Sequence, residues 1–281
     1  MLGAYQYPWP AVPEKYVTVD GIATHLHHTG PTTLPGTPPD TSLGRTLLCV
    51  HGSGNNGHSF MPLLERLGHA HSVIAVSLPA HARSAGLESL GSIEAMAAHI
   101  AGVIEALGLQ RPVVMGHSMG GAVALELALE RPQAVGGLVI IGSLAKFPPL
   151  PDEVFQPLRD VVEGRARRSF PRDAYSPSTP DEVVHRGWME DAKTDPRVML
   201  GDLLSIRGWA ADERLGEIAA PTLVIWGEDE FPPMRDGGLA LGRGIGGARS
   251  LTVPEAGHMV HFEQPDLVAE AVRSFLEELP A

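Results

Sequence analysis

Three short segments of this 281-residue chain carry side chains that together could cleave a carbonyl compound. The first, Gly116-His117-Ser118-Met119-Gly120, matches the pattern G-x-S-x-G and stands directly after an apolar run and before a helical pattern. In that context a sharp strand-to-helix turn lifts the serine hydroxyl above a sheet, while the two glycines let neighbouring backbones approach closely. The segment therefore predicts Ser118 as a nucleophile.

A serine hydroxyl needs a general base, and the second segment, "AGHMVHFEQPD", supplies two histidines. His258 lies in the predicted loop between the last strand and the final helix, downstream of Ser118. His261 follows three residues later, nearer the start of that helix. We predict His258 as the base and keep His261 as its local rival, whereas His51 is interpreted as a buried structural histidine.

Acyl transfer also requires N–H donors for the oxyanion of the tetrahedral intermediate. The strand-to-helix turn provides one of them, the backbone N–H of Met119, which follows the nucleophile. The loop "VHGSGNNGHSF" should provide the second, and we predict the N–H of Ser53, with Gly54 as the alternative.

The third segment, "LVIWGEDEFPPMRD", places three carboxylates directly after an apolar strand. They are Glu228, Asp229 and Glu230. A carboxylate at this position could accept the Nδ1–H of a catalytic histidine and fix its tautomer. The residue types alone leave open which of the three would do so.

The elements that must position these groups alternate between short apolar runs and helical patterns. Six runs are nearly all apolar without alternation, as in parallel strands covered on both faces: 46–50, 72–78, 112–116, 136–142, 221–227 and 249–254. Residues 15–30 read as an opening hairpin that turns at Asp20-Gly21, and helices are predicted over 93–107, 122–130 and 266–279. This order predicts an α/β fold with a doubly wound, mostly parallel sheet.

Residues 144–216 interrupt the alternation. They contain many prolines, no strand-like run, and helical patches near 180–190 and 196–209. We interpret them as a helical cap inserted into a core formed by residues 1–143 and 217–281. The cap should roof a substrate pocket, for which the candidate apolar lining residues are Phe60, Leu144, Trp188 and Trp209.

The composition narrows the possible partners. A net charge of −12 argues against a nucleic-acid surface, and no apolar stretch approaches the ~20 residues of a membrane span. The single cysteine, Cys49, permits no internal disulfide, and the N-terminus lacks a secretory signal pattern. We therefore expect a cytoplasmic protein that acts on a small molecule. No metal-ligand pattern such as H-E-x-x-H occurs, and the sequence predicts no oligomeric state.

In combination, "LLCVHGSGNNGHSF", "VSLPAHARS", "GHSMGG", "LVIWGEDEFPP" and "AGHMVHFEQPD" resemble the α/β-hydrolase fold superfamily, in its lidded esterase, lactonase and C–C hydrolase branch. The resemblance covers nearly the whole chain outside the predicted cap, and the order serine, acid, histidine fits it. One turn departs from the pattern. The family's D-x-P-G-x-G-x-S reads here as Ser77 to Ser84, with serine in place of the aspartate and Ala80 and Ala82 in place of two glycines.

The resemblance implies that the triad acid follows the seventh strand, because no carboxylate follows the sixth at Gly142-Ser143-Leu144. The family spacing G-x-x-D-x-x-x-P gives two answers: counting from Gly227 selects Glu230, whereas counting back from Pro233 selects Asp229. We favour Asp229, with Glu230 as the alternative, because aspartate is the commoner acid in this branch.

The implied activity is hydrolysis of a carboxylic ester, lactone or thioester of a neutral or hydrophobic substrate, without a cofactor or metal. The alternatives in the same fold are a C–C bond hydrolase and a cofactor-free lyase or oxygenase. From a different class, the fold also serves as a small-ligand receptor with slow or vestigial cleavage.

Overall fold

One eight-stranded sheet organises the computed structural model, which describes residues 12–34, 36–148, 151–169 and 172–280. The strand order is β1-β2-β4-β3-β5-β6-β7-β8. β1 and β2 pair antiparallel with their neighbours, and β4, β3, β5, β6, β7 and β8 run parallel. The strands are β1 (Glu14–Val19), β2 (Ile22–His28), β3 (Thr46–Val50), β4 (Ser72–Val76), β5 (Val113–His117), β6 (Gly137–Ile141), β7 (Thr222–Gly227) and β8 (Arg249–Val253).

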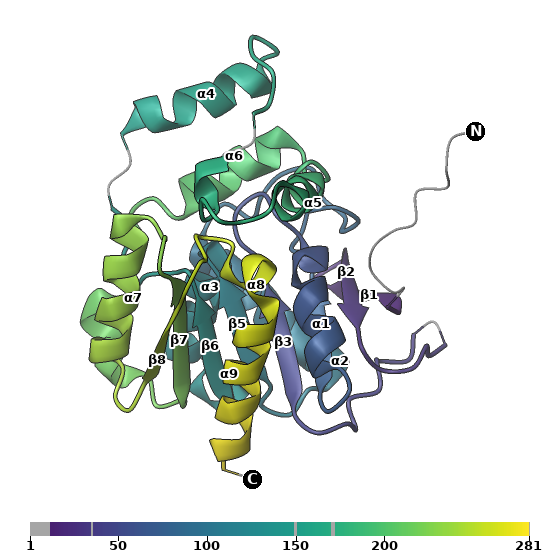
Figure 1. Cartoon of the computed structure of the whole chain (residues 1–281). Coiled ribbons are helices and arrows are strands. Elements are labelled where there is room, and N and C mark those ends of the chain that lie inside the picture. The colour runs from purple at the N-terminus through teal and green to yellow at the C-terminus, as the bar shows by residue number, and fades with distance from the viewer. Residues whose placement is uncertain (1–11, 35, 149–150, 170–171, 281) are drawn as a thin grey trace.

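Helices cover both faces of the sheet, as Figure 1 shows. The described α-helices are α1 (Met61–Leu67), α2 (Ile93–Leu107), α3 (Met119–Glu130), α4 (Asp152–Val162), α5 (Asp181–Asp191), α6 (Pro196–Ser205), α7 (Pro232–Gly244), α8 (Val260–Glu263) and α9 (Pro265–Glu278). Short 3₁₀ turns lie at η1 (Gly57–Phe60), η2 (Pro132–Ala134), η3 (Arg172–Ala174) and η4 (Asp212–Glu217). The predicted doubly wound α/β fold is confirmed.

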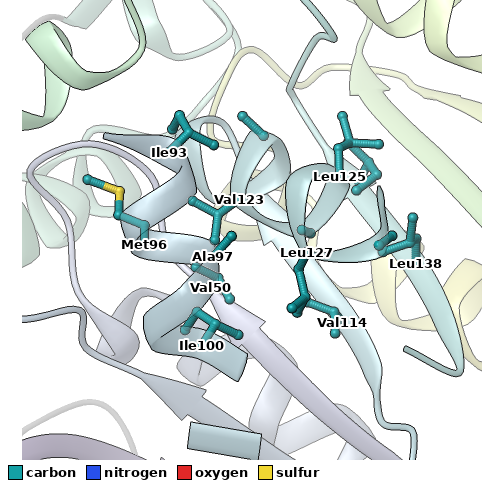
Figure 2. Packing of buried hydrophobic residues seen from close by; sticks show 14 of the residues in the cluster. Val50, Ile93, Met96, Ala97, Ile100, Val114, Val123, Leu125, Leu127 and Leu138 are labelled. Carbon is teal, nitrogen blue, oxygen red and sulfur yellow. The ribbon is translucent and has the colours of Figure 1, made fainter. Parts of the chain in front are cut away.

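Two apolar layers hold the helices against the sheet. On one face α2, α3 and α7 pack against the strands, and on the other α1, α8 and α9 do so. Figure 2 shows part of the first layer, in which Ile93, Ala97 and Ile100 of α2 face Val123 and Leu127 of α3 above the strand residues Val50, Val114 and Leu138. Because the parallel strands carry apolar side chains on both faces, their sequences show no alternation.

Local signals fix the ends of several elements. The hairpin turns at Asp20 and Gly21, whose φ angles of 49° and 80° are those of a tight turn between antiparallel strands. The Ser92 hydroxyl accepts a hydrogen bond from the Ala95 N–H at 3.1 Å and caps α2, which ends at Gly108 with φ 66°. These positions agree with the sequence predictions.

Residues 144–216 contain α4, α5 and α6, which lie above the upper edge of the sheet in Figure 1. The parallel strands end at this edge, so the loops after β3, β5, β7 and β8 meet beneath these helices. The sequence did not predict α4, which contains Pro157 and is anchored by the fully buried Phe155 under the Arg207 guanidinium. None of the described helices is long and apolar enough to cross a lipid bilayer.

Candidate active site

Ser118 occupies a strained turn between β5 and α3. Its φ of 52° and ψ of −119° are sparsely populated by residues other than glycine, and its N–H donates to the Ile141 carbonyl at 2.9 Å. A Cβ on Gly116 would lie 2.1 Å from the Gly120 carbonyl oxygen, and one on Gly120 would lie 2.1 Å from that of Val50. Both glycines of G-x-S-x-G are therefore required by close backbone contacts.

His258 is fixed by its backbone on two sides. Its N–H donates to the Ala174 carbonyl at 2.8 Å, and its carbonyl oxygen accepts from His117 Nε2 at 3.0 Å. The first contact ties the loop to the segment above the sheet, and the second ties it to the residue before Ser118. The ring, which is 16% exposed, lines the same cavity as Ser118.

Glu230, and not Asp229, is the carboxylate that meets His258. The Nδ1 of His258 lies 3.1 Å from Glu230 Oε1 and 3.0 Å from Oε2, and the Glu230 side chain is fully buried. Asp229 is exposed and accepts a hydrogen bond from the Ser176 hydroxyl at 2.6 Å. The preference for Asp229 is therefore wrong as to which carboxylate contacts the histidine.

The backbone after β7 explains this correction. The Asp229 N–H donates to the Ala256 carbonyl at 2.9 Å, and the Glu230 N–H donates to that of Gly227 at 3.3 Å. The chain therefore turns at once, so Asp229 faces outward and Glu230 faces inward. Counting forward from Gly227 therefore selects the carboxylate that contacts His258. Relative to the family spacing G-x-x-D-x-x-x-P, this chain is one residue shorter between Glu230 and Pro233.

The electrostatics of His258 suit a general base. Burial alone would lower its pKa, but the charge of Glu230 and its hydrogen bond outweigh burial, and Glu263 contributes further, so the pKa of His258 is raised above its ordinary value. His261 behaves differently. It is fully buried, stacks on Phe60 with centroids 4.9 Å apart, and burial together with the neighbouring His258 lowers its pKa to about 3. His261 does not line the cavity beside Ser118.

The predicted oxyanion donors lie side by side. Among the described residues, no acceptor is hydrogen-bonded to the backbone N–H of Ser53 or of Met119. The two residues touch through Ser53 Oγ and Met119 Sδ, 3.5 Å apart. The alternative donor, the Gly54 N–H, is already bonded to Asp202 Oδ2 at 2.8 Å. The geometry is thus compatible with Ser53 and Met119 and unfavourable for Gly54.

Asp202, which the sequence analysis missed, joins α6 to the loop that carries Ser53. This carboxylate is fully buried and accepts hydrogen bonds from the Gly54 N–H, from the Ser89 hydroxyl at 2.6 Å and, at 2.7 Å, from His81 Nε2. A Cβ on Gly54 would lie 2.7 Å from Met199 Cγ, so α6 also packs directly on this loop.

His81 reaches Asp202 from the turn that departs from the family pattern. Ala80 and Ala82, which replace glycines there, keep positive φ angles of 67° and 47°. Each such residue costs roughly 1–2 kcal/mol. The hydrogen bonds of the turn, including Ala80 N–H to the Ala85 carbonyl at 2.9 Å, hold this conformation. No sequence pattern relates His81 to Asp202, because 121 positions separate them.

A cavity of about 200 Å³ lies between α5, α6 and the strand ends. Gly52, Ser53, Ser118 and His258 line it from the core, and Tyr175, Gly187, Asp191, Met199, Leu203 and Ile206 from the segment above. Two larger hollows, of about 530 and 510 Å³, lie away from Ser118 and His258 and contain neither residue. Of these three cavities, the smallest is the one that Ser118 and His258 line.

None of the four aromatic or aliphatic residues predicted to line the pocket is in this cavity, so those predictions are wrong. Phe60 and Leu144 are buried in the core layers, Trp188 is 39% exposed beside His185, and Trp209 donates to Glu126 Oε2 at 3.0 Å. For Trp188, the orientation of α5 explains the error. α5 presents Gly187 and Asp191 to the cavity, and α6 presents Met199 and Leu203, each pair at i, i+4 spacing.

The described residues whose ligand atoms converge closely enough for a metal ion are Glu14, His25 and His27, on the β1–β2 hairpin. They do not line the cavity at Ser118. The chemistry available at the cavity is therefore that of a serine hydroxyl, an imidazole paired with a carboxylate, and backbone N–H donors.

Comparison with known proteins agrees with this geometry. Residues 47–271 match the model of the Alpha/beta hydrolase family. The chain is 31% identical over 293 residues to a 2-hydroxy-6-oxononadienedioate/2-hydroxy-6-oxononatrienedioate hydrolase of Burkholderia vietnamiensis, covering 93% of this chain and 95% of that protein. It is 29% identical over 256 residues to a 2-hydroxy-6-oxo-6-phenylhexa-2,4-dienoate hydrolase of Comamonas testosteroni, covering 84% of this chain and 88% of the other.

Among solved structures, a thermophilic esterase from Thermogutta terrifontis superposes with a TM-score of 0.80 at 24% identity, covering 96% of this chain and all of the other. The family match spans most of the chain and includes Ser118 and His258. This chain belongs to the alpha/beta hydrolase family and is a hydrolase of that fold.

Proposed function

We propose that this protein is a serine hydrolase that cleaves the carboxylic ester, lactone or thioester of a small neutral substrate. One observation carries the proposal: Ser118 and the Glu230-paired His258 line a single cavity, next to Ser53 and Met119, whose N–H groups have no acceptor among the described residues. Each component of acyl transfer thus has a candidate group within reach of the same space.

In the proposed mechanism, His258 Nε2 takes the proton of the Ser118 hydroxyl while Ser118 Oγ attacks the carbonyl carbon. The N–H groups of Ser53 and Met119 donate to the oxyanion that forms. His258 then returns the proton to the departing alcohol, and the acyl group stays on Ser118 until water, deprotonated by His258, releases it. Glu230 accepts the Nδ1–H throughout, which keeps Nε2 directed toward Ser118 and stabilises the imidazolium.

The cavity favours a small neutral acyl group. Its volume of about 200 Å³ lies below the range of roughly 300–1,000 Å³ of pockets for drug-sized ligands. Among the described residues that line it, Asp191 is charged and there is no lysine or arginine. Residues 144–216 act in this proposal as a cap that excludes water and selects the substrate.

C–C bond hydrolysis is the second candidate, because both curated relatives described above are hydrolases of 2-hydroxy-6-oxo-dienoate compounds at 29–31% identity. These substrates are anionic. A site for them would benefit from a cation facing the carboxylate, whereas the cavity presents Asp191, whose partner Arg168 lies 2.7 Å away in an ion pair. The charge of the lining therefore favours the ester proposal.

The test is steady-state turnover of short-chain 4-nitrophenyl esters by the wild-type protein and by Ser118→Ala. We expect multiple turnovers that fall by about 10³-fold or more in the variant. Ser143→Ala is the matched control, because Ser143 is buried next to the turn but has no part in the mechanism. A single stoichiometric burst without turnover would instead support a receptor. Turnover of a 2-hydroxy-6-oxo-dienoate with none of esters would support C–C cleavage.

A further inference from the structure

A second cluster of chemically capable side chains lies on one face of the β1–β2 hairpin, apart from the catalytic cavity. His25 and His27 are two residues apart on β2, so both point to the same face of the strand. Glu14 of β1 is directly opposite His27 in the strand register and shares this face. Strand pairing therefore places one carboxylate against two imidazoles.

The potential ligand atoms of these three residues all lie within 4.8 Å of one another. Glu14 Oε2 lies 3.4 Å from His25 Nε2, and Glu14 Oε1 lies 3.8 Å from His27 Nδ1. A zinc ion with bonds of about 2.0–2.2 Å in tetrahedral geometry holds its ligands about 3.4 Å apart. Small rotations of the side chains would thus complete the coordination without a change in the strands.

Both imidazoles are buried, and apart from their contacts with Glu14 their nitrogens are poorly satisfied. His25 is 2% exposed and His27 is 5% exposed. Among the described residues, neither nitrogen of His25, nor Nδ1 of His27, has a hydrogen-bond partner. Because buried polar groups in proteins are nearly always hydrogen-bonded, these unsatisfied nitrogens point to a ligand.

We propose that Glu14, His25 and His27 form a binding site for a divalent cation of the zinc class, held by two imidazole nitrogens and one carboxylate. This ligand set suits Zn²⁺ and excludes Mg²⁺ and Ca²⁺, which prefer oxygen ligands. Glu14, which is exposed on the hairpin edge, gives the ion a route from solvent. The proposal is independent of the mechanism at Ser118.

Arg83 competes with the cation for Glu14. Its guanidinium forms an ion pair with Glu14 Oε2, and its side chain is 63% exposed. The cation must displace this guanidinium, which can move into solvent at little cost because exposed ion pairs contribute little to stability. Removing Arg83 should therefore strengthen binding, an effect opposite to that of removing a ligand.

Isothermal titration calorimetry of the untagged full chain with ZnCl₂ tests the site. We expect one ion to bind per chain in the wild type. Glu14→Gln and His25→Asn should each weaken the affinity at least tenfold, since loss of an outer-shell partner already costs about 10–100-fold. Arg83→Gln should tighten it. The exposed His69→Asn serves as the control for adventitious surface binding and should leave the affinity unchanged.

Absence of saturable binding to the wild type would overturn the proposal. Affinity that is unchanged in Glu14→Gln would overturn it as well, and this variant changes an exposed residue and should keep the fold. An Arg83→Gln variant that binds no more tightly than the wild type would contradict the role of Glu14 as a ligand.

Discussion

At the scale of single residues, the main result is which carboxylate contacts His258. Glu230 contacts Nδ1 of His258 through both oxygens, at 3.1 and 3.0 Å, whereas Asp229 faces Ser176. The two carboxylates are neighbours in sequence and differ by one methylene. Their environments are nevertheless opposite, because one is buried and the other is exposed.

Paired amide substitutions test this assignment. Glu230→Gln should lower kcat/KM by about 10²–10⁴-fold, since an amide cannot stabilise the imidazolium and favours the wrong tautomer. Asp229→Asn is the matched control and should remain within about threefold, because its loss perturbs one partly exposed hydrogen bond to Ser176. Steady-state ester hydrolysis measures both variants. If Asp229→Asn suffers the larger loss, Glu230 is not the acid.

The pH profile provides a second test at this scale. His258 must be neutral to accept the Ser118 proton, and its raised pKa means that kcat/KM falls as the pH drops through a value above 6.5, its ordinary pKa. In Glu230→Gln the charge and the hydrogen bond of Glu230, which raise the pKa of His258 most, are lost, whereas burial still lowers it and the smaller contribution of Glu263 remains. The acidic limb of the residual activity should therefore move to lower pH. An acidic limb that stays in place, or moves to higher pH, would show that Glu230 does not raise the pKa of His258.

The sequence was sufficient to place Ser118 in the turn between β5 and α3 and His258 in the loop after β8, because each stands in a motif whose backbone context is local. It was insufficient to identify the carboxylate that contacts His258. The choice between Asp229 and Glu230 depends on the hydrogen bond from the Asp229 N–H to the Ala256 carbonyl, a contact between loops 27 positions apart. The family spacing could not decide between them, because counting from Gly227 and counting back from Pro233 select different residues.

At the scale of elements, α6 and the loop after β3 act as one unit through Asp202. The carboxylate accepts from the Gly54 N–H, next to Ser53, and from His81 in the turn after β4. In the proposed mechanism the Ser53 N–H donates to the oxyanion. Asp202 is then a positioning residue, which acts on the reaction through the loop.

Asp202→Asn should lower kcat for ester hydrolysis by about tenfold, less than the 10²–10³-fold cost of removing an oxyanion donor outright. Binding of a trifluoromethyl ketone analogue should weaken more than KM rises, because the loop meets the oxyanion in the tetrahedral state. Asp195→Asn is the control: it lies at the N-terminus of the same helix, where asparagine caps equally well. If Asp202→Asn weakens binding of the analogue only as much as it raises KM, the role of Asp202 is structural alone.

Core elements were predictable, and the orientation of the helices above the sheet was not. The apolar runs of the parallel strands and the capping signals of α2 are local patterns. The rotation of α5 and α6 depends on tertiary contacts such as those of Asp202. It brings Met199 and Leu203 of α6 to the cavity and leaves Trp188 of α5 outside it. α4 was missed because Pro157 lies inside it.

At the scale of the whole molecule, Arg45 connects the start of β3 to the C-terminal end of α9. Its Nε donates to the Leu276 carbonyl at 3.1 Å, and its Nη2 donates to those of Leu279 and Pro280 at 2.6 and 2.9 Å. The Leu276 carbonyl lies in the last turn of α9 and the other two lie just beyond it, so none of them has an intrahelical donor. Arg45 lies at the opposite end of β3 from the catalytic loops, so its role is in stability.

Arg45→Met should therefore lower the free energy of unfolding by about 1–2 kcal/mol while kcat/KM at low temperature stays unchanged. Denaturant unfolding, with Arg235→Met as the control, measures this. Arg235 is exposed, and its ion pair with the adjacent Asp236, at 3.7 Å, should contribute little. If Arg45→Met is as stable as the wild type, water replaces the hydrogen bonds of Arg45 without loss of stability, and the prediction is wrong.

The most direct test of the account is the site of covalent modification. A fluorophosphonate reacts with a serine activated by a neighbouring imidazole, and the product occupies the oxyanion site. Intact-mass and peptide mass spectrometry should find one adduct per chain on Ser118, formed quickly in wild type and in Asp229→Asn and far more slowly in Glu230→Gln. An unlabelled protein, or a label on another residue, would contradict the proposed mechanism.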